Sequence, residues 1–475
     1  MQKIKLSALI LAVSLSASAF AGCAKVAEDF IEREPPSEEV IYDQSKENAE
    51  LLGKYNTHKE NSTLAFTTYE KNEKSDFEYE IQNEKVIIKK YIGERDIVVI
   101  PDVIDGIAVY ELADRAFEGL QVRAVYVPDS VEKIGFAVFS ECSKMSTLRL
   151  PIVGNGENID FGGYIFGAEE YFENGLKVPG SLKMILLGEN VKKIDENAFF
   201  GFKSVEAFVL PGGIESIENF AFNDCRSLVY INFPNTLKSI GQYSFLNCQS
   251  LYTIALPESL ESVGLGAFMD CSEIRNLTLP FIGNTREENR FIGYMFGATR
   301  GEWNESFVPK TLANVTLLGS SVNVPESAFY DCTSLYTVDI LDGIESIGVS
   351  AFEGCISLVS VNIGASVKTI SENAFSGCKS LSKIAFSENS TLSKISMQAF
   401  MGCESLYELN FPDSLKRIEK SAFYNCKSIT KISARGIEHI GESAFRNCNS
   451  INSVSGINKD AVTEKGNSTL LATMN

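Results

Sequence analysis

The chain has 475 residues, of which 62 are acidic and 43 are basic, so its formal net charge is −19. A chain this acidic is repelled by nucleic acid and by anionic lipid surfaces. We therefore expect no nucleic-acid partner and a soluble, extracellular surface.

Residues 1–22 have the features of a secretory signal peptide, because Lys3 and Lys5 precede a short apolar run that ends in small residues. The sequence Phe20-Ala-Gly-Cys23 that follows resembles a bacterial lipobox, although Phe20 replaces the usual leucine. Cys23 would then carry the lipid and become the mature N-terminus. The alternative is cleavage after Ala21, which would release the protein to the outside. Cys23 is the only cysteine outside the repeat described below, and this favours lipidation.

Residues 23–76 are predicted to be an acidic, disordered tether. Nine acidic residues lie between Glu28 and Glu50, against only Arg33 and Lys46, and Pro35-Pro36 lies among them. Such a segment is too polar and too self-repelling to fold alone. Its role would be to hold the rest of the chain away from the membrane.

Residues 77–110 are predicted to form an N-terminal β cap. Three alternating or apolar runs, at 77–81, 86–91 and 97–100, have the pattern of strands, and Asp105-Gly106 has that of a tight turn.

Residues 111–455 repeat one unit, in most places every 23 residues. In the copy that begins at Leu228, a short strand ends at Pro234, a second apolar pair follows at Leu237 and Ile240, and a turn carries Phe245 and Cys248. A fixed period of this length is typical of a solenoid, whose coils bury their apolar edges against one another. Ten cysteines occupy the same slot, three residues after a phenylalanine: Cys142, Cys225, Cys248, Cys271, Cys332, Cys355, Cys378, Cys403, Cys426 and Cys448.

The repeated cysteines are predicted to be a reduced, buried ladder. No two of them are close enough in sequence to form the paired motif that zinc prefers, and a disulfide framework would have varied spacings. The same slot holds Leu120 and Phe202 in two copies, so it is hydrophobic. We expect no metal and no cofactor.

Two gaps in the period hold related insertions, at about 151–183 and 280–313. Each contains an aromatic- and glycine-rich run and ends in an additional strand, so the array has about 14 coils. Tyr164, Phe166, Tyr294 and Phe296 recur and are predicted to plug the side of the solenoid. The divergent tips, with Tyr171, Phe172 and Trp303, are candidates for ligand contact.

The repeat pattern, L-x-x-I-x-L-P-x-x-L-x-x-I-x-x-x-A-F-x-x-C, resembles the BspA-type leucine-rich repeat family over roughly residues 97–455. The resemblance implies a mainly β fold with short helical turns, in which a curved solenoid carries a parallel sheet on its concave side. It also implies roles in attachment at bacterial cell surfaces. The remaining residues, 456–475, are predicted to be a frayed tail.

No catalytic function is expected. The chain has only two histidines, His58 and His439, and neither has a fixed partner for a triad or a metal site. No phosphate-binding glycine motif is present.

The leading hypothesis is therefore a lipid-anchored, adhesin-like binding module for an extracellular protein or glycan, attached to the membrane only through the lipid. The alternatives are a structural spacer or self-associating envelope protein and a glycan-active enzyme. Strand alternation places a set of apolar side chains on the concave face near the N-terminal end, and these are the predicted ligand contacts: Tyr126, Met184, Leu186, Val209 and Tyr230. The first insertion could instead fold over this patch.

Overall fold

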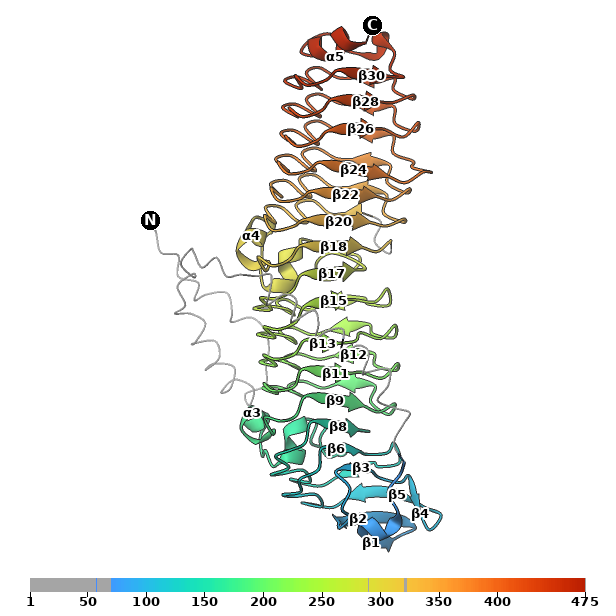
Figure 1. The fold of residues 1–475 in the computed structure, drawn as a ribbon, viewed down its shortest axis with the longest axis vertical. Helices are drawn as coiled ribbons and strands as arrows, with labels where there is room; N and C mark the ends of the chain where they lie inside the picture. The colour runs from blue at the N-terminus through green and yellow to red at the C-terminus, as the bar shows by residue number, and fades with distance from the viewer. Residues whose placement is uncertain (1–56, 58–69, 289, 320–322, 475) are drawn as a thin grey trace, which may run out of the picture. The chain divides into compact units, whose positions relative to one another are not determined.

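The computed structural model describes residues 70–288, 290–319 and 323–474, together with Thr57. The predicted signal peptide (1–22), Cys23 and the tether as far as residue 69 lie outside the described residues. The described chain from Glu70 onward is a solenoid of stacked parallel strands with about 16 turns, against about 14 predicted. The predicted fold class, a mainly β leucine-rich repeat solenoid, is confirmed (Figure 1).

The N-terminal cap begins earlier than predicted. Asn72 is buried, its backbone N–H donates to the Val99 carbonyl oxygen at 2.9 Å, and its Oδ1 accepts the Val99 N–H at 2.9 Å. Residues 70–76 therefore belong to the folded unit and not to the tether, because this asparagine extends the edge of strand β3. The other elements of the cap are the 3-10 turn η1 (Lys74–Asp76) and strands β1 (Phe77–Gln82), β2 (Lys85–Tyr91), β4 (Val103–Ile104) and β5 (Ile107–Leu112).

One strand from each turn contributes to a main row, whose outer side is called the strand face below. Hydrogen bonding divides the row into segments of six, six and three strands. Its strands are β3 (Ile97–Val99), β6 (Ala124–Tyr126), β8 (Thr147–Leu150), β9 (Met184–Leu187), β11 (Ala207–Val209), β13 (Tyr230–Ile231), β15 (Thr253–Ala255), β17 (Asn276–Leu279), β18 (Asn314–Leu317), β20 (Thr337–Ile340), β22 (Ser360–Ile363), β24 (Lys383–Phe386), β26 (Glu408–Asn410), β28 (Lys431–Ser433) and β30 (Ser453–Ser455).

A second row of two-residue strands lies on another side of each turn. Each strand pairs a polar residue with an inward Ile or Val, which is the aliphatic residue five positions before the repeat phenylalanine. These strands are β7 (Lys133–Ile134), β10 (Lys193–Ile194), β12 (Ser216–Ile217), β14 (Ser239–Ile240), β16 (Ser262–Val263), β19 (Asn323–Val324), β21 (Ser346–Ile347), β23 (Thr369–Ile370), β25 (Lys394–Ile395), β27 (Arg417–Ile418) and β29 (His439–Ile440).

The third side of each turn carries the phenylalanine and cysteine of the repeat. Within the regular runs of turns from Phe199 to Phe268 and from Phe329 to Phe445, neighbouring repeat phenylalanines stack face to face. Phe352 and Phe375, for example, have ring centroids 5.0 Å apart and planes 4° from parallel. All ten repeat cysteines are free and buried, which confirms the predicted ladder. The thiols of nine of them donate to the carbonyl oxygen of the preceding turn's phenylalanine, as Cys248 Sγ does to Phe222 O at 3.2 Å.

The backbone bends twice around each phenylalanine. The residue just before the cysteine slot has a φ of 53–77° in all twelve copies, and the residue two before the phenylalanine has a φ of 52–63°. Left-handed backbone favours Gly, Asn and Asp. The first of these positions holds one of those three residues in eleven copies, with Glu141 the exception.

Both insertions have the same local structure. A 3-10 turn ends at a left-handed glycine, Gly167 or Gly297, and is followed by a shorter 3-10 turn and one turn of α-helix. The segments are η2 (Gly162–Phe166), η3 (Tyr171–Glu173) and α3 (Asn174–Lys177) in the first insertion, and η4 (Ile292–Phe296), η5 (Gly301–Trp303) and α4 (Asn304–Phe307) in the second. Phe166 and Phe296 are buried in the core beside them, while Tyr164 and Tyr294 are half-buried.

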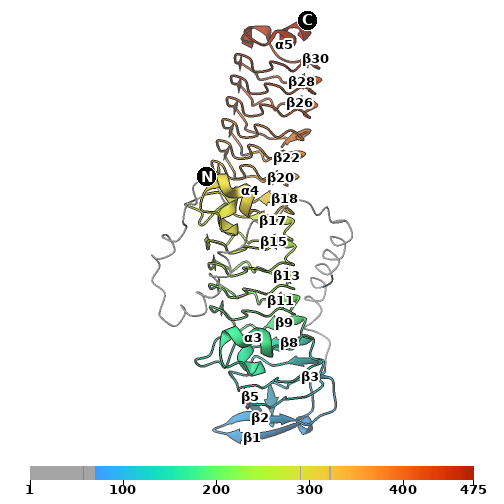
Figure 2. The same ribbon diagram turned by 90° about the vertical axis from the view of Figure 1, so that its left-hand side faces the viewer.

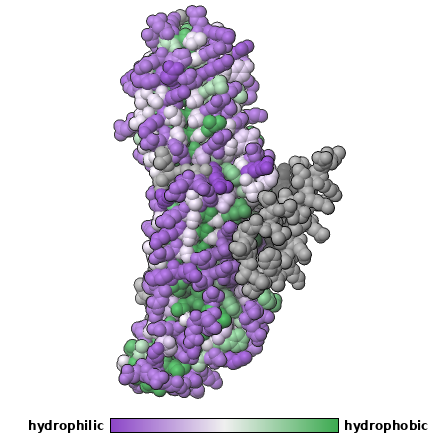
Figure 3. Space-filling model, turned by 180° about the vertical axis from the view of Figure 1, so that it is seen from behind, coloured by the Kyte–Doolittle hydropathy of each residue, from purple (hydrophilic) through white to green (hydrophobic). Residues whose placement is uncertain are grey.

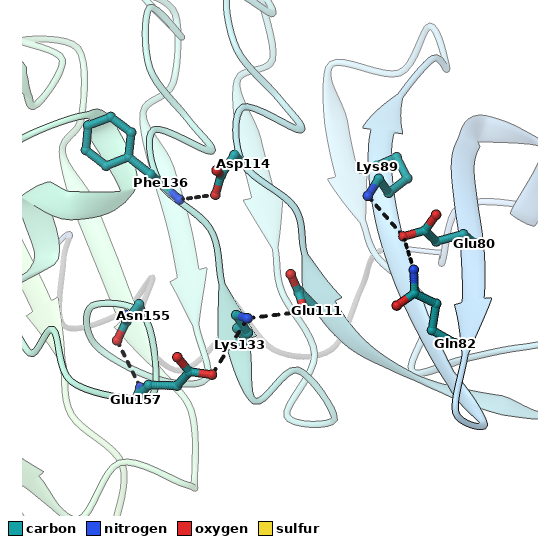
Figure 4. A network of polar contacts seen from close by, with 9 residues as sticks. All are labelled: Glu80, Gln82, Lys89, Glu111, Asp114, Lys133, Phe136, Asn155 and Glu157. Atoms are coloured by element: carbon teal, nitrogen blue, oxygen red, sulfur yellow. Dashed lines mark hydrogen bonds and ion pairs between the residues drawn. The ribbon is translucent and has the colours of Figure 1, made fainter.

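Polar contacts link the cap to the first insertion (Figure 4). The Lys133 ammonium lies 3.7 Å from a carboxylate oxygen of both Glu111 and Glu157. These two carboxylates, Glu111 first, raise the pKa of Lys133. Asp114 accepts the Phe136 backbone N–H at 2.8 Å, which fixes the next turn to the end of β5.

The tail predicted to be frayed is instead an ordered C-terminal cap. It contains the turn η6 (Lys459–Ala461) and the helix α5 (Ser468–Thr473), and it buries Leu470 in the core. The buried Asn467 side chain accepts the Phe445 N–H at 3.0 Å and donates to the Gly441 carbonyl at 2.9 Å. The prediction was wrong because it relied on the polar composition of the tail. Composition does not reveal that one asparagine side chain makes the hydrogen bonds that the backbone of a further turn would otherwise make. None of the helices in the described residues is both long and apolar enough to cross a bilayer.

Candidate ligand-binding surface

The strand face contains an apolar patch near its N-terminal end. The pairing registers align Met184 with Ala207 and Tyr230, and Leu186 with Val209. The residues between them on the strands, such as Ile185 and Phe208, point into the core. The five outward residues form a second buried hydrophobic cluster, separate from the core, and are called the apolar patch below: Met184, Leu186, Ala207, Val209 and Tyr230.

Tyr126 does not belong to the apolar patch. The register places Arg149 between Tyr126 and Leu186 on the same line of the strand face. The Arg149 guanidinium donates to the Asp129 carboxylate at 2.7 Å and to the Val127 carbonyl at 2.6 Å. Sequence reasoning missed Arg149 because it omitted β8 from the list of outward positions, although alternation along Thr147–Leu150 was sufficient to find it.

The patch ends at β13, where Asn232 interrupts the strand. Its side-chain amide accepts the Leu210 N–H and donates to the Leu210 carbonyl, both at 2.8 Å. The Asn232 side chain thus binds the neighbouring backbone.

The middle of the strand face is polar, and its side chains form hydrogen bonds with one another across neighbouring strands. Asn276 donates to Thr253 at 3.2 Å, and Asn314 donates to Asn276 at 2.8 Å. Thr337 then donates to Asn314 at 2.7 Å, which completes a chain of side-chain hydrogen bonds across four strands. Further along, Lys383, Glu408 and Lys431 are exposed at the matching positions. The strand face therefore changes along its length from apolar to amide- and hydroxyl-rich to charged.

The aromatic residues of the insertions lie apart from the patch. Tyr171 packs edge-on against Phe172 and Phe200, at centroid distances of 5.7 and 5.6 Å, and Phe172 remains 57% exposed. In the second insertion Trp303 stacks on Phe307 at 6.2 Å and is 40% exposed. Both insertions project beside the strand row and not over it (Figures 1 and 2). The first insertion thus does not fold over the patch, and the predicted contact residues form separate groups.

The side of the molecule that is turned away from the viewer in Figure 1 is mostly hydrophilic. Its hydrophobic residues form a narrow band along the stack (Figure 3).

The described residues contain no group of three or more His, Cys, Asp or Glu side chains arranged to hold a metal ion. His439 lies on β29, and His58 lies outside the described residues. The buried thiols are also unsuited to act as nucleophiles or metal ligands, because both roles require the thiolate form. Burial raises the pKa of Cys142 to about 11 and also raises those of Cys248 and Cys403.

The stacked turns, the parallel main row and the phenylalanine–cysteine ladder define a leucine-rich repeat solenoid protein. The family described as "BspA type Leucine rich repeat region (6 copies)" matches residues 107–166, 173–293, 304–391 and 386–473. The chain therefore belongs to the BspA-type leucine-rich repeat family.

Several solved structures are similar to the chain. A leucine-rich repeat protein from Bacteroides ovatus is 23% identical, with 81% of this chain and 94% of that one covered and a TM-score of 0.35. A leucine rich cell surface protein from Faecalibacterium prausnitzii is 20% identical, with coverages of 83% and 98% and a TM-score of 0.27. A leucine-rich repeat protein from T. pallidum is 24% identical, with coverages of 61% and 91% and a TM-score of 0.22. A search of curated proteins gives no match.

Proposed function

We propose that this chain is a bacterial surface lipoprotein, anchored through Cys23, that acts as a non-catalytic, adhesin-like binding module for an extracellular protein or glycan. Its membership of the BspA-type family supports attachment at a cell surface. The long rows of stacked strands support an extended recognition surface, which is how solenoid proteins commonly bind. The acidic net charge of −19 makes a nucleic-acid partner unfavourable.

The observation that carries the proposal is the apolar patch. Met184, Leu186 and Val209 lie on the outer side of a sheet whose inner side already supplies the core. Soluble proteins seldom place a contiguous apolar surface outside the core unless another group covers it. The patch is therefore the proposed contact region of the strand face, with the exposed Phe172 and Trp303 as secondary contacts.

The test is the double substitution Leu186→Asp with Val209→Asp in the full-length protein. The matched control is Thr278→Asp with Thr316→Asp, which places the same charges on outward positions of β17 and β18. Binding is measured on a glycan array and on immobilised extracellular-matrix proteins, and folding is checked by circular dichroism. Loss of binding to a given ligand in the first variant alone supports the patch. Unchanged binding by a folded first variant removes the patch as the contact region.

The anchor is tested separately. Cys23→Ala is expected to move the protein from the membrane fraction to the medium, while Cys142→Ala, which changes a buried repeat cysteine, leaves it in the membrane. Mass spectrometry of the mature N-terminus gives the modification directly. An unmodified N-terminus at Gly22 would show that cleavage follows Ala21 and that the protein is released.

A further inference from the structure

The tip of the second insertion, residues 301–307, exposes the only tryptophan of the chain. Trp303 is 40% exposed, and its ring stacks on that of Phe307 with the centroids 6.2 Å apart. The buried Asn304 side chain donates to the Ser327 carbonyl oxygen at 3.2 Å, which ties the tip to the next turn of the solenoid. The exposed indole is therefore presented at a fixed position on the side of the molecule.

Carboxylates lie close to this tip. Glu302 and Glu305 belong to the tip itself, and Asp331 and Glu353 follow on later turns. Burial raises the pKa of Asp331, and the nearby Glu305 and Glu353 carboxylates raise it further. Asp331 also raises the pKa of Tyr330, and Glu302 contributes a smaller increase. The four carboxylates therefore act on one another and give the surface beside Trp303 a negative charge.

This negative charge is only partly neutralised within the protein. The Lys310 ammonium lies 4.0 Å from a Glu305 carboxylate oxygen. Within the described part of the chain, Glu302 and Asp331 form no ion pair. The turns that follow add to the charge, because residues 326–363 contain six acidic residues and no basic one. The tip is therefore electrostatically complementary to a positively charged partner.

The tryptophan ring already has one cationic neighbour. The guanidinium carbon of Arg300 lies 5.7 Å from the centre of the Trp303 ring. This distance is within the range of a cation–π contact. The tip thus accepts a guanidinium group from its own chain, and a cationic side chain of a partner would make the same kind of contact.

The first insertion has the same local structure without this charge. Gly175 corresponds there to Glu305, and a β-carbon added at Gly175 would lie 3.7 Å from the Lys203 ammonium. Gly201 occupies the position that corresponds to Asp331. The combination of an exposed aromatic residue and unpaired carboxylates is therefore specific to the second insertion.

We propose that the tip of the second insertion binds a Lys/Arg-rich segment of a partner protein, with Trp303 contacting a cationic side chain and Glu302 and Asp331 pairing with its charge. The aromatic ring supplies contact area, and the carboxylates select the sign of the partner's charge. The proposal rests on the proposed function in one respect, namely that the chain binds an extracellular partner. It gives Trp303 a partner of defined chemistry at a site separate from the apolar patch.

The test uses an oligoarginine peptide as the probe and an oligoglutamate peptide of the same length as the negative probe. Because Trp303 is the only tryptophan, its fluorescence in the full-length protein reports binding at this tip. The arginine peptide should change the fluorescence saturably, and the glutamate peptide should leave it unchanged. Glu302→Gln with Asp331→Asn should weaken binding of the arginine peptide several-fold.

The matched control is Glu169→Gln with Glu170→Gln, which removes the same amount of charge near the tip of the first insertion. This variant should bind the arginine peptide as the unmodified protein does. Circular dichroism checks the folding of both double variants. Glu302→Gln alone changes only an exposed side chain, and it keeps the test valid if the variant at the half-buried Asp331 does not fold.

Three results would overturn the inference. Equal weakening by the two double variants would show that the peptide responds only to the net charge of the chain. An unchanged Trp303 fluorescence at peptide concentrations that saturate the protein by calorimetry would place the binding elsewhere. Equal binding of the glutamate peptide would show that the tip does not select a cation. None of these measurements involves the apolar patch, so their failure is distinct from failure of the proposed binding function.

Discussion

The thiol of Cys248 donates to the carbonyl oxygen of Phe222, 3.2 Å away in the preceding turn. The same oxygen also accepts the Cys225 N–H at 3.2 Å, so each carbonyl of this type joins its own turn to the next. The cysteine slot is thus both an apolar position and a hydrogen-bond donor position. This relationship changes what a substitution there should do.

Cys248→Ser should lower the free energy of unfolding by about 1 kcal/mol, because the hydroxyl keeps the Phe222 acceptor and loses mainly apolar contact. The larger penalty expected for a buried hydroxyl without a partner does not apply. Cys248→Leu should cost more, about 1–3 kcal/mol, because it overfills a slot between two stacked cysteines and removes the donor. Urea unfolding of both variants checks the order. A serine variant less stable than the leucine variant would contradict the bridging role.

The buried thiols should make the protein less stable at alkaline pH. Burial raises the pKa of Cys142 to about 11 and also raises that of Cys355 above the ordinary value of 9.0. Unfolding therefore releases protons above pH 9. The stabilisation that these neutral thiols provide is complete below that pH and is lost as pH rises toward the folded-state pKa.

Thermal unfolding between pH 8 and 10.5 measures this effect. Cys142→Ser has no thiol to titrate at that position, so its unfolding temperature should fall less steeply over this range than that of the unmodified protein. Equal slopes would show that Cys142 makes no contribution. Native alkylation of the repeat cysteines at pH 8 should be slow for the same reason.

The left-handed position before the cysteine slot should tolerate asparagine but not valine. Gly377 has a φ of 75°, and a β-carbon added there would meet no atom closer than 3.8 Å. Any cost of substitution is therefore conformational. Gly377→Val should destabilise by about 1–2 kcal/mol, and Gly377→Asn should be nearly neutral. Urea midpoints of the two variants give the comparison, and equal losses would contradict this explanation.

The Asn467 side chain should stabilise the last turns of the solenoid against local unfolding. Asn467→Ala leaves the Phe445 N–H and the Gly441 carbonyl without this partner, at about 1 kcal/mol or more for each group. Hydrogen exchange of residues 439–455 should become faster, while exchange near Phe245 stays the same. Asn458→Ala, which removes only a local turn contact, is the matched control. If exchange in the last turns is unchanged, the side chain has no closing role.

Most of the fold was predictable because every copy of the repeat places equivalent residues in the same environment, so the pattern recurs many times in the sequence. Twelve copies of the unit located the inward Ile or Val, the phenylalanine and the cysteine slot, and the structure places Ile240, Phe245 and Cys248 in one core. The cap at Asn72 and the cap at Asn467 occur once each. They depend on side-chain amides that pair with backbone groups distant in sequence, and no local pattern indicates such pairing.

The candidate site was predictable only in part. Strand alternation correctly placed Met184, Leu186, Val209 and Tyr230 on the outer side of the sheet. It could not show that these side chains are buried, because burial depends on tertiary packing and not on alternation. It also gave no distance between Trp303 and the patch, since the path of an irregular insertion is set by tertiary packing.

The Asn467 cap has a consequence for how copies of this chain can associate. An open solenoid end presents unpaired backbone groups and apolar side chains, and a second solenoid could add there as further turns, producing fibres. Here Val462 pairs with Ile440, and Leu470 fills the core at the end of the stack. Growth by end-to-end stacking on this cap would therefore require α5 to detach first.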